Sequence, residues 1–208
     1  MRPPERTRVR VSPGAPALLA VFVWLSSPEV LGAVLLAALG HELGHYAVLR
    51  SRGGWVRHME ISALGANMQV AGRLSYGSEL LAAAGGPAVN LLLAAALAAL
   101  GRWWEPLYLL AGAQAVLGCF NLLPILPLDG GRMLWLALCW RTDPFLADRM
   151  AGGVSLAAAG LLTAAGAALA RRSPFLLWTA VCLLCCTAGP CIKRRKSVYA
   201  SGKREASA

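Results

Sequence analysis

Long apolar runs, separated by short charged or glycine-rich segments, dominate the sequence. A run of about 20 apolar residues can cross the ~30 Å hydrocarbon core of a bilayer as a helix. Five runs have this length, whereas a sixth, 16–27, covers only about 18 Å because Pro28 ends its helix. The run at 150–170 is mostly alanine, glycine and leucine, so we expect it to serve only in helix packing. The pattern predicts an all-α polytopic membrane protein with about six transmembrane helices, at 16–27, 29–49, 79–100, 106–127, 150–170 and 174–192.

A different pattern separates the second run from the third. Residues 53–76 contain no long apolar run, and polar and apolar residues alternate over 58–63 and again over 67–70. A period of two is typical of β-strands, because successive side chains point to opposite faces of a sheet. We therefore expect a small β-hairpin within 53–76. It should lie at the cytoplasmic face, since open strand edges are not tolerated in lipid.

Composition and charge support a membrane location. Hydrophobic residues make up 57% of the chain and charged residues 14%, which is unlike a soluble domain. If 16–27 crosses the bilayer, every Lys and Arg except Arg102, Arg171 and Arg172 lies on one side, and the positive-inside rule makes that side cytoplasmic. We expect a multi-pass protein of the cell membrane with both termini in the cytoplasm. Its membrane-embedded domain covers 1–192, and 193–208 form a basic tail.

The net charge of +10 does not indicate a nucleic-acid-binding protein, because the positive residues flank the apolar runs instead of lining one soluble face. A cysteine cluster also has a simple interpretation. C-x-x-C spacing occurs in metal and redox sites, but this cluster lies between an apolar run and a basic segment. We interpret it as small hydrophobic residues of a membrane helix, with a metal or redox site as the alternative. The cluster consists of Cys182, Cys185, Cys186 and Cys191.

The clearest chemical signal is the sequence His41-Glu42-Leu43-Gly44-His45 inside the second apolar run. On a helix, H-E-x-x-H places two imidazoles on one face, close enough to bind one metal ion. Glu42 can then act as the base that takes a proton from a metal-bound water. Ionisable residues are costly inside a membrane helix unless they have a function, so we favour a catalytic zinc site over a polar helix contact.

A catalytic zinc ion usually takes three protein ligands, so a third must come from another segment. Asp129 directly follows an apolar run and is the only aspartate among the first 142 residues. Pro124 and Pro127 interrupt the helix before it, and a broken helix at membrane depth is tolerated where it lines a cavity. His58, in the expected hairpin, is the rival third ligand, although an interfacial histidine is the simpler interpretation.

These residues resemble the site-2 protease family of intramembrane zinc metalloproteases. The resemblance rests on HELGH at 41–45, on Gly-Pro-x-x-Asn at 86–90 and on N-x-x-P-x-x-P-x-D-G at 121–130. It covers roughly residues 30–135, with the motifs in the family's order. The third motif is most similar to the compact bacterial subgroup that contains the stage IV sporulation protease.

The resemblance implies that His41, His45 and Asp129 bind zinc, that Glu42 is the base, and that Asn121 lies near the site and holds substrate. For Asn121 an interhelical hydrogen bond is the alternative, and for Asn90 we favour it. The expected hairpin is similar in position to a family element that offers an edge strand to substrate. The implied reaction is hydrolysis of a peptide bond within or next to a transmembrane segment of a membrane-associated protein, as in regulated intramembrane proteolysis.

The sequence alone identifies neither the substrate nor the way in which the activity is controlled. The sporulation protease carries a nucleotide-sensing domain after its helices, whereas we expect only the basic tail here, so that mode of control should be absent or supplied by a regulatory membrane partner. His45 lies five residues before Arg50, about 7.5 Å along a helix, which predicts cleavage in the cytoplasmic third of a substrate's transmembrane segment or just beside it. The main alternative function is a non-catalytic membrane scaffold that binds transmembrane partners. Two further alternatives, a membrane zinc protease of the prenyl-protein type and a zinc transporter, agree less well with the positions of the acidic residues in the sequence.

Overall fold

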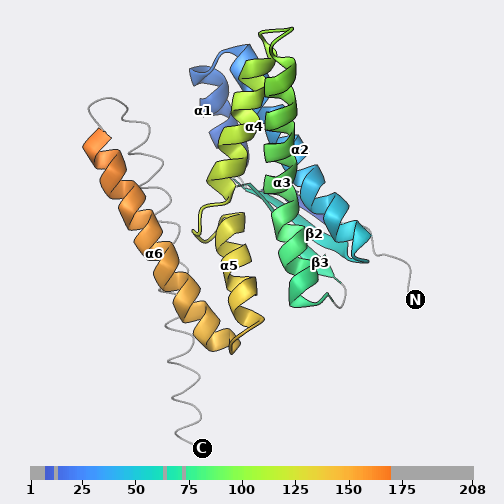
Figure 1. The fold of residues 1–208 in the computed structure, drawn as a ribbon, viewed down its shortest axis with the longest axis vertical. Coiled ribbons are helices and arrows are strands. Elements are labelled where there is room, and N and C mark those ends of the chain that lie inside the picture. The colour runs from blue at the N-terminus through green and yellow to red at the C-terminus, as the bar shows by residue number, and fades with distance from the viewer. Residues whose placement is uncertain (1–7, 12–13, 63–64, 72–73, 170–208) are drawn as a thin grey trace, which may run out of the picture. The chain divides into compact units, whose positions relative to one another are not determined.

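Six helices and three strands make up the part of the chain that the computed structural model describes, residues 8–11, 14–62, 65–71 and 74–169 (Figure 1). The chain divides into two units, Met1–Leu122 and Leu123–Ala208. The first contains β1 (Arg8–Val11), α1 (Gly14–Leu25), α2 (Pro28–Ser51), β2 (Trp55–Ser62), β3 (Gly65–Ala71), α3 (Tyr76–Leu100) and α4 (Leu107–Asn121). The second contains α5 (Asp129–Cys139) and α6 (Pro144–Leu169).

The helices of the first unit begin at residues suited to that task. Ser27 caps α2, because its hydroxyl accepts a hydrogen bond from the Val30 amide, and Pro28 occupies the first turn, where its missing N–H costs nothing. Ser75 caps α3 in the same way through the Ser78 amide. α2 ends before Gly53, whose φ of 77° is one that L-residues rarely adopt.

α2 and α3 cross at a pair of facing glycines. A Cβ atom built on Gly44 would lie 2.5 Å from the Gly85 carbonyl oxygen, and one built on Gly85 would lie 2.7 Å from that of Gly44. A side chain at either position would force the two backbones apart. The glycines therefore set the short separation of α2 and α3 on which the site depends.

The strands of the first unit form one sheet in the order β1-β2-β3. β2 and β3 pair antiparallel, with Ser62 opposite Gly65, so the alternating pattern in 53–76 correctly predicted two paired strands. Residues 63 and 64, between them, lie outside the described residues, and the cytoplasmic position of this region stays a prediction. The expected two-stranded hairpin was incomplete, because β1 adds a third strand parallel to β2, with Arg8 opposite His58.

The second unit begins with a loop over 123–128 that precedes α5, and after α5 a turn leads into α6. Ile125 and Leu128 from the loop are buried with Ala159 of α6, which forms the core of this unit. The run 106–127 was predicted as one helix, and that prediction was wrong in extent. α4 ends at Asn121 because Pro124 and Pro127 cannot continue the hydrogen-bond ladder, and the chain resumes as a separate helix at Asp129.

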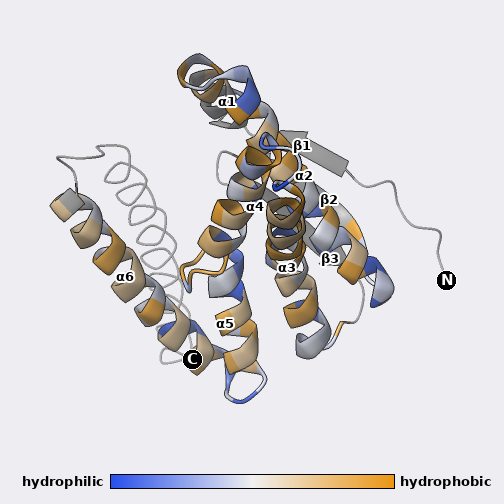
Figure 2. Ribbon diagram, turned by 45° about the horizontal axis from the view of Figure 1, so that its top comes forward, coloured by the Kyte–Doolittle hydropathy of each residue, from blue (hydrophilic) through white to orange (hydrophobic). Residues whose placement is uncertain are grey.

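Among the residues that the structure describes, three helices are long and apolar enough to cross a membrane: Pro28–Ser51, Tyr76–Leu100 and Pro144–Ala168. They confirm the apolar runs expected at 29–49, 79–100 and 150–170, and hydrophobic residues predominate along them (Figure 2). α1 has only 12 residues, which is short for a span. The run at 174–192, its cysteine cluster and the tail at 193–208 lie outside the described residues.

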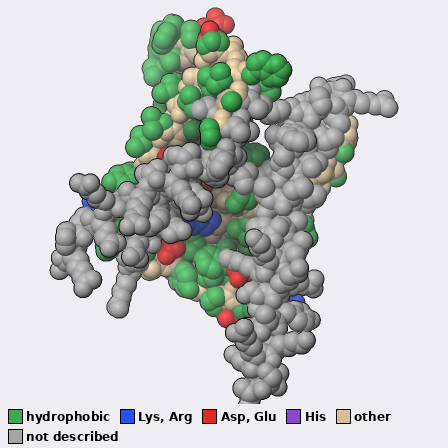
Figure 3. Space-filling model, turned by 180° about the vertical axis from the view of Figure 1, so that it is seen from behind, with side chains coloured by type: hydrophobic (Ala, Val, Ile, Leu, Met, Phe, Trp, Pro, Cys, Tyr) green, Lys and Arg blue, Asp and Glu red, His purple; other side chains and the backbone are tan. Residues whose placement is uncertain are grey.

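Large hydrophobic side chains remain exposed on these helices, as expected for surfaces that face lipid. In the part of the surface that grey atoms leave visible in Figure 3, hydrophobic side chains are numerous and some charged side chains lie among them. On α2 the exposed fraction is 56% for Leu36 and 57% for Leu39, while Ala37 between them is fully buried. The polar chemistry of α2 thus lies on its inner face, away from the lipid-facing leucines.

Candidate metal centre

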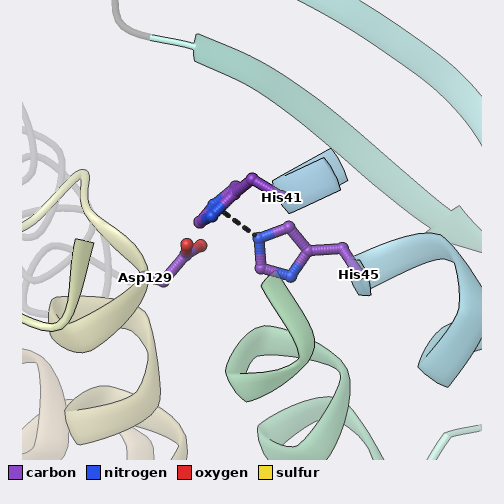
Figure 4. Close-up of side chains that lie close together, drawn as sticks. All are labelled: His41, His45 and Asp129. Atoms are coloured by element: carbon purple, nitrogen blue, oxygen red, sulfur yellow. Dashed lines mark hydrogen bonds between the residues drawn. The ribbon is translucent and has the colours of Figure 1, made fainter. Parts of the chain in front are cut away.

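His41 and His45 lie one turn apart on α2, with their rings turned toward each other (Figure 4). The two Nε2 atoms are 3.0 Å apart, and the rings meet edge to face at 85° with centroids 4.6 Å apart. His41 is 6% exposed and His45 is half-buried. The H-E-x-x-H spacing therefore produces the paired imidazoles that it predicted.

The other nitrogen of His41 is held by Asn90 of α3. The distance from His41 Nδ1 to Asn90 Oδ1 is 3.0 Å, and Asn90 is fully buried. Asn90 Nδ2 donates to the Ala37 carbonyl oxygen at 3.3 Å, which turns Oδ1 toward the histidine. Because this oxygen can only accept, His41 must donate through Nδ1 and keep the lone pair on Nε2.

His45 has the same arrangement, with a backbone partner. Its Nδ1 lies 2.8 Å from the Ala82 carbonyl oxygen, which again requires Nδ1 to be the donor. The Gly86 amide also approaches this Nδ1, at 3.3 Å. One nitrogen cannot donate to Ala82 and accept from Gly86 together, and the shorter contact favours the proton on Nδ1. The lone pair of His45 is then also on Nε2.

These two bonds make the pair suited to a metal ion. Two Nε2 lone pairs only 3.0 Å apart repel each other unless a cation or a proton lies between them. Two Zn–N bonds of about 2.0–2.1 Å at a tetrahedral angle would separate the nitrogens by about 3.3 Å, close to the distance found. Hydrogen bonds from the remote ring nitrogens are also the usual support of metal-binding histidines.

The Gly-Pro-x-x-Asn segment of α3 builds this support. Gly86 lies against the His45 ring, and a Cβ atom there would collide with the imidazole. Asn90 lies one turn further along and holds His41. The sequence predicted an interhelical hydrogen bond for Asn90, which the structure confirms. It did not identify the partner as His41, because residues 49 apart are brought together only by the helix crossing.

The remaining candidates are placed as follows. Glu42 is half-buried on α2 between the two histidines. Asn121 is the last residue of α4, and its Nδ2 donates to the Leu117 carbonyl oxygen of its own helix at 3.0 Å. His58 lies in β2, paired in register with Gln69 of β3, and its role as a rival ligand stays a hypothesis.

Asp129 belongs to the second unit, where it is the first residue of α5 and is half-buried. A carboxylate at this position is stabilised by the free amides of the first helical turn. Gly131 follows, and a Cβ atom there would lie 2.5 Å from the backbone of Ile125. The second glycine of the motif thus lets the loop fold onto the helix that carries Asp129.

A buried polar residue of the first unit, Gln114, was missed by the sequence analysis. Gln114 of α4 is 3% exposed, and within the described residues its Oε1 has no hydrogen-bond partner. It lies near Gly40, the residue before His41, where a Cβ atom would come 3.8 Å from Gln114 Nε2. Its position inside an apolar run was the feature of the sequence that could have identified it.

Comparisons with known proteins agree with this chemistry. The model of peptidase family M50 matches residues 95–165, which include Asn121 and Asp129. The chain is 34% identical over 163 residues to the putative zinc metalloprotease Rip3 of Mycobacterium tuberculosis, in strains Erdman and H37Rv. That alignment covers 70% of this chain and 39% of the relative, so the chain spans well under half of the curated proteins it matches.

The fold is that of a solved site-2 protease. The structure of the site-2 protease from Methanocaldococcus jannaschii is similar with a TM-score of 0.69. The likeness covers 86% of this chain and 88% of that chain, at 21% sequence identity. At this identity the comparison concerns the fold.

Proposed function

We infer that this chain belongs to peptidase family M50, and we propose that it is an intramembrane zinc metalloprotease of the site-2 type. It hydrolyses a peptide bond within or next to a transmembrane segment of a membrane-associated protein. The observation that carries the proposal is the histidine pair of α2. Its Nε2 atoms lie 3.0 Å apart, and each remote nitrogen, Nδ1, donates a hydrogen bond to an oxygen of α3.

The zinc ligands are His41, His45 and Asp129. Each residue offers one atom of a kind that zinc binds, two imidazole nitrogens and one carboxylate oxygen. The loop before α5 supports the assignment of Asp129, because its prolines and the following glycines place a carboxylate at a helix N-terminus next to a broken membrane helix. The match of 95–165 to family M50 includes this residue.

When bound, zinc supplies a Lewis acid that polarises the scissile carbonyl group and makes a water molecule acidic. Glu42, in the turn that carries both histidines, accepts the proton of that water and delivers it to the leaving amine. Asn90 and the Ala82 carbonyl group keep both imidazoles in the tautomer whose Nε2 is free to bind the metal. Asn121, at the end of α4, binds the substrate backbone.

The substrate is a membrane-spanning protein that approaches through the lipid bilayer. Cleavage falls in the cytoplasmic third of its span, because His45 lies five residues before Arg50 and positive residues favour the cytoplasmic side. Both termini are cytoplasmic, and a membrane partner supplies regulation. The N-x-x-P-x-x-P-x-D-G form of the motif at 121–130 supports a similarity to the compact bacterial subgroup of the sporulation protease.

The test combines metal analysis with a cleavage assay. The wild-type chain and Asp129→Asn are purified, their zinc content is measured, and both are tested on a panel of single-span substrates. Asp143→Asn is the matched control, because Asp143 caps α6 through the Leu146 amide and asparagine can do the same. We expect Asp129→Asn alone to lose zinc and activity. Full zinc content in Asp129→Asn would remove Asp129 from the ligand set.

A further inference from the structure

α6 carries a buried hydroxyl where the sequence predicted only packing. Ser155 is 2% exposed and lies in line with Ala147, Ala151 and Ala159, which are fully buried. Its Oγ accepts a hydrogen bond from the Leu126 amide at 3.0 Å and donates one to the Pro124 carbonyl oxygen at 3.3 Å. One side chain thus fixes two backbone groups of the loop that leads to Asp129.

This loop is short of hydrogen-bond partners. Pro124 and Pro127 have no N–H, and the loop is not helical. The Ile125 amide bonds to Leu123 and the Leu128 amide bonds to Ile125, each at 2.7 Å, within the loop itself. The Leu126 amide instead donates to the side-chain hydroxyl of Ser155 in α6. In an apolar environment a backbone amide without a hydrogen-bond partner is destabilising, so the serine hydroxyl matters to the loop's conformation.

The loop is tied to the start of α5 as well as to α6. Ile125 packs so closely on Gly131 that no Cβ atom fits there, and Ile125 itself is fully buried. Asp129 follows Leu126 by three residues, and the helix begins there. A second bond joins α5 to α6, from Trp135 Nε1 to Asp148 Oδ1 at 2.6 Å. The direction of the Asp129 carboxylate therefore depends on the path of a loop that α6 holds.

We infer that Ser155 is a positioning residue for Asp129. Its hydroxyl holds the backbone at Pro124 and Leu126, and through that loop it keeps the carboxylate of Asp129 in the conformation that binds the metal. The inference rests on the proposed function, because it takes Asp129 as a metal ligand. It gives α6 a role in positioning a metal ligand in addition to its role in helix packing.

The test compares two hydroxyl deletions in α6 within the intact chain. Ser155→Ala removes the hydroxyl bonded to the loop. Thr163→Val removes a hydroxyl that bonds to the Ala159 carbonyl oxygen of its own helix, at 2.8 Å, and keeps the size of the side chain. Zinc affinity is measured by competition with a chelator, and backbone hydrogen exchange of 122–128 is followed by mass spectrometry. Neither measurement requires a substrate.

We expect Ser155→Ala to speed exchange in 122–128 and to weaken zinc binding roughly 10-fold, the lower end of the range for residues that support a metal ligand. Thr163→Val should change neither. If Ser155→Ala does not fold, Ser155→Cys serves, since a thiol of similar size is a weaker hydrogen-bonding group. Wild-type zinc affinity in a folded Ser155 variant overturns the inference.

Asp129→Asn separates this inference from the proposed function. If Asp129→Asn weakens zinc binding and Ser155→Ala does not, Asp129 is a ligand and Ser155 does not position it. If Asp129→Asn binds zinc like the wild type, the proposed ligand set fails. In the Asp129→Asn background we expect Ser155→Ala to weaken zinc binding no further, because two changes that act through one ligand are not additive. A further 10-fold loss there would contradict the inference.

Discussion

The Oδ1 atom of Asn90 lies 3.0 Å from the Nδ1 atom of His41, and both residues are buried. Because Asn90 also donates to the Ala37 carbonyl oxygen, its amide has only one orientation that satisfies both bonds. The tautomer of His41 is therefore set by α3. A residue outside the H-E-x-x-H motif thus decides whether the motif can bind a metal.

Replacing Asn90 should weaken metal binding without removing a ligand. We expect Asn90→Leu to lower zinc affinity roughly 10- to 100-fold, because the imidazole loses the acceptor that fixes its tautomer. Asn90→Asp should retain more affinity, since a carboxylate oxygen also accepts the Nδ1–H bond. Chelator competition on the purified variants measures both. Equal affinities for Asn90→Leu and the wild type would show that His41 does not need this partner.

Enlarging Gly86 should disturb His45 directly. A methyl group at Gly86 collides with the imidazole, so we expect Gly86→Ala to displace the ring, to reduce zinc binding and to destabilise the chain by about 1–3 kcal/mol. Thermal unfolding and zinc content measure these effects. Gly112→Ala in α4 is the control, because nothing lies within 4 Å of a Cβ atom there. Similar losses in both variants would point to a general cost of alanine in these helices.

The extent to which the sequence predicts this fold differs between its elements. Long apolar runs identified α2, α3 and α6, because a helix that crosses the bilayer requires about 20 predominantly apolar residues. The start of α6 was placed six residues late, since Asp148 and Arg149, in its second turn, precede the apolar run from which the helix was predicted. β1 was missed because four residues are too few to show a pattern, and its pairing with β2 is not local.

The candidate site was predictable to a similar degree. A local motif revealed His41, Glu42 and His45, because their spacing alone places them on one helix face. The supporting bonds of Asn90 and Ser155 could not be predicted, since Asn90 joins two helices and Ser155 joins a helix to a loop, in both cases between residues distant in sequence. The sequence shows that Asn90 and Ser155 lie within apolar runs, but it does not identify their hydrogen-bond partners.

Glu42 offers a test that separates a protease from a scaffold. Glu42→Gln keeps the size of the side chain and removes the base, so we expect cleavage to fall at least about 100-fold while zinc content stays at the wild-type level. Substrate cleavage is followed in membranes or detergent micelles. Glu105→Gln is the control, because Glu105 is exposed in the turn between α3 and α4. Wild-type biological activity in Glu42→Gln would favour the non-catalytic scaffold.

Gln114 should limit the stability of the first unit. Its Oε1 is buried, and within the described residues it has no hydrogen-bond partner, which costs about 1–3 kcal/mol. We expect Gln114→Leu to raise the Tm by a few degrees, because leucine of similar size carries no polar group. Asn90→Leu removes an amide that does have partners, so it should lower the Tm and serves as the contrast. Thermal unfolding of the metal-free chains measures the difference without the contribution of zinc. A lower Tm for Gln114→Leu would mean that this amide binds a water molecule or another polar group inside the helices, and a cleavage assay would then show whether that group serves the reaction.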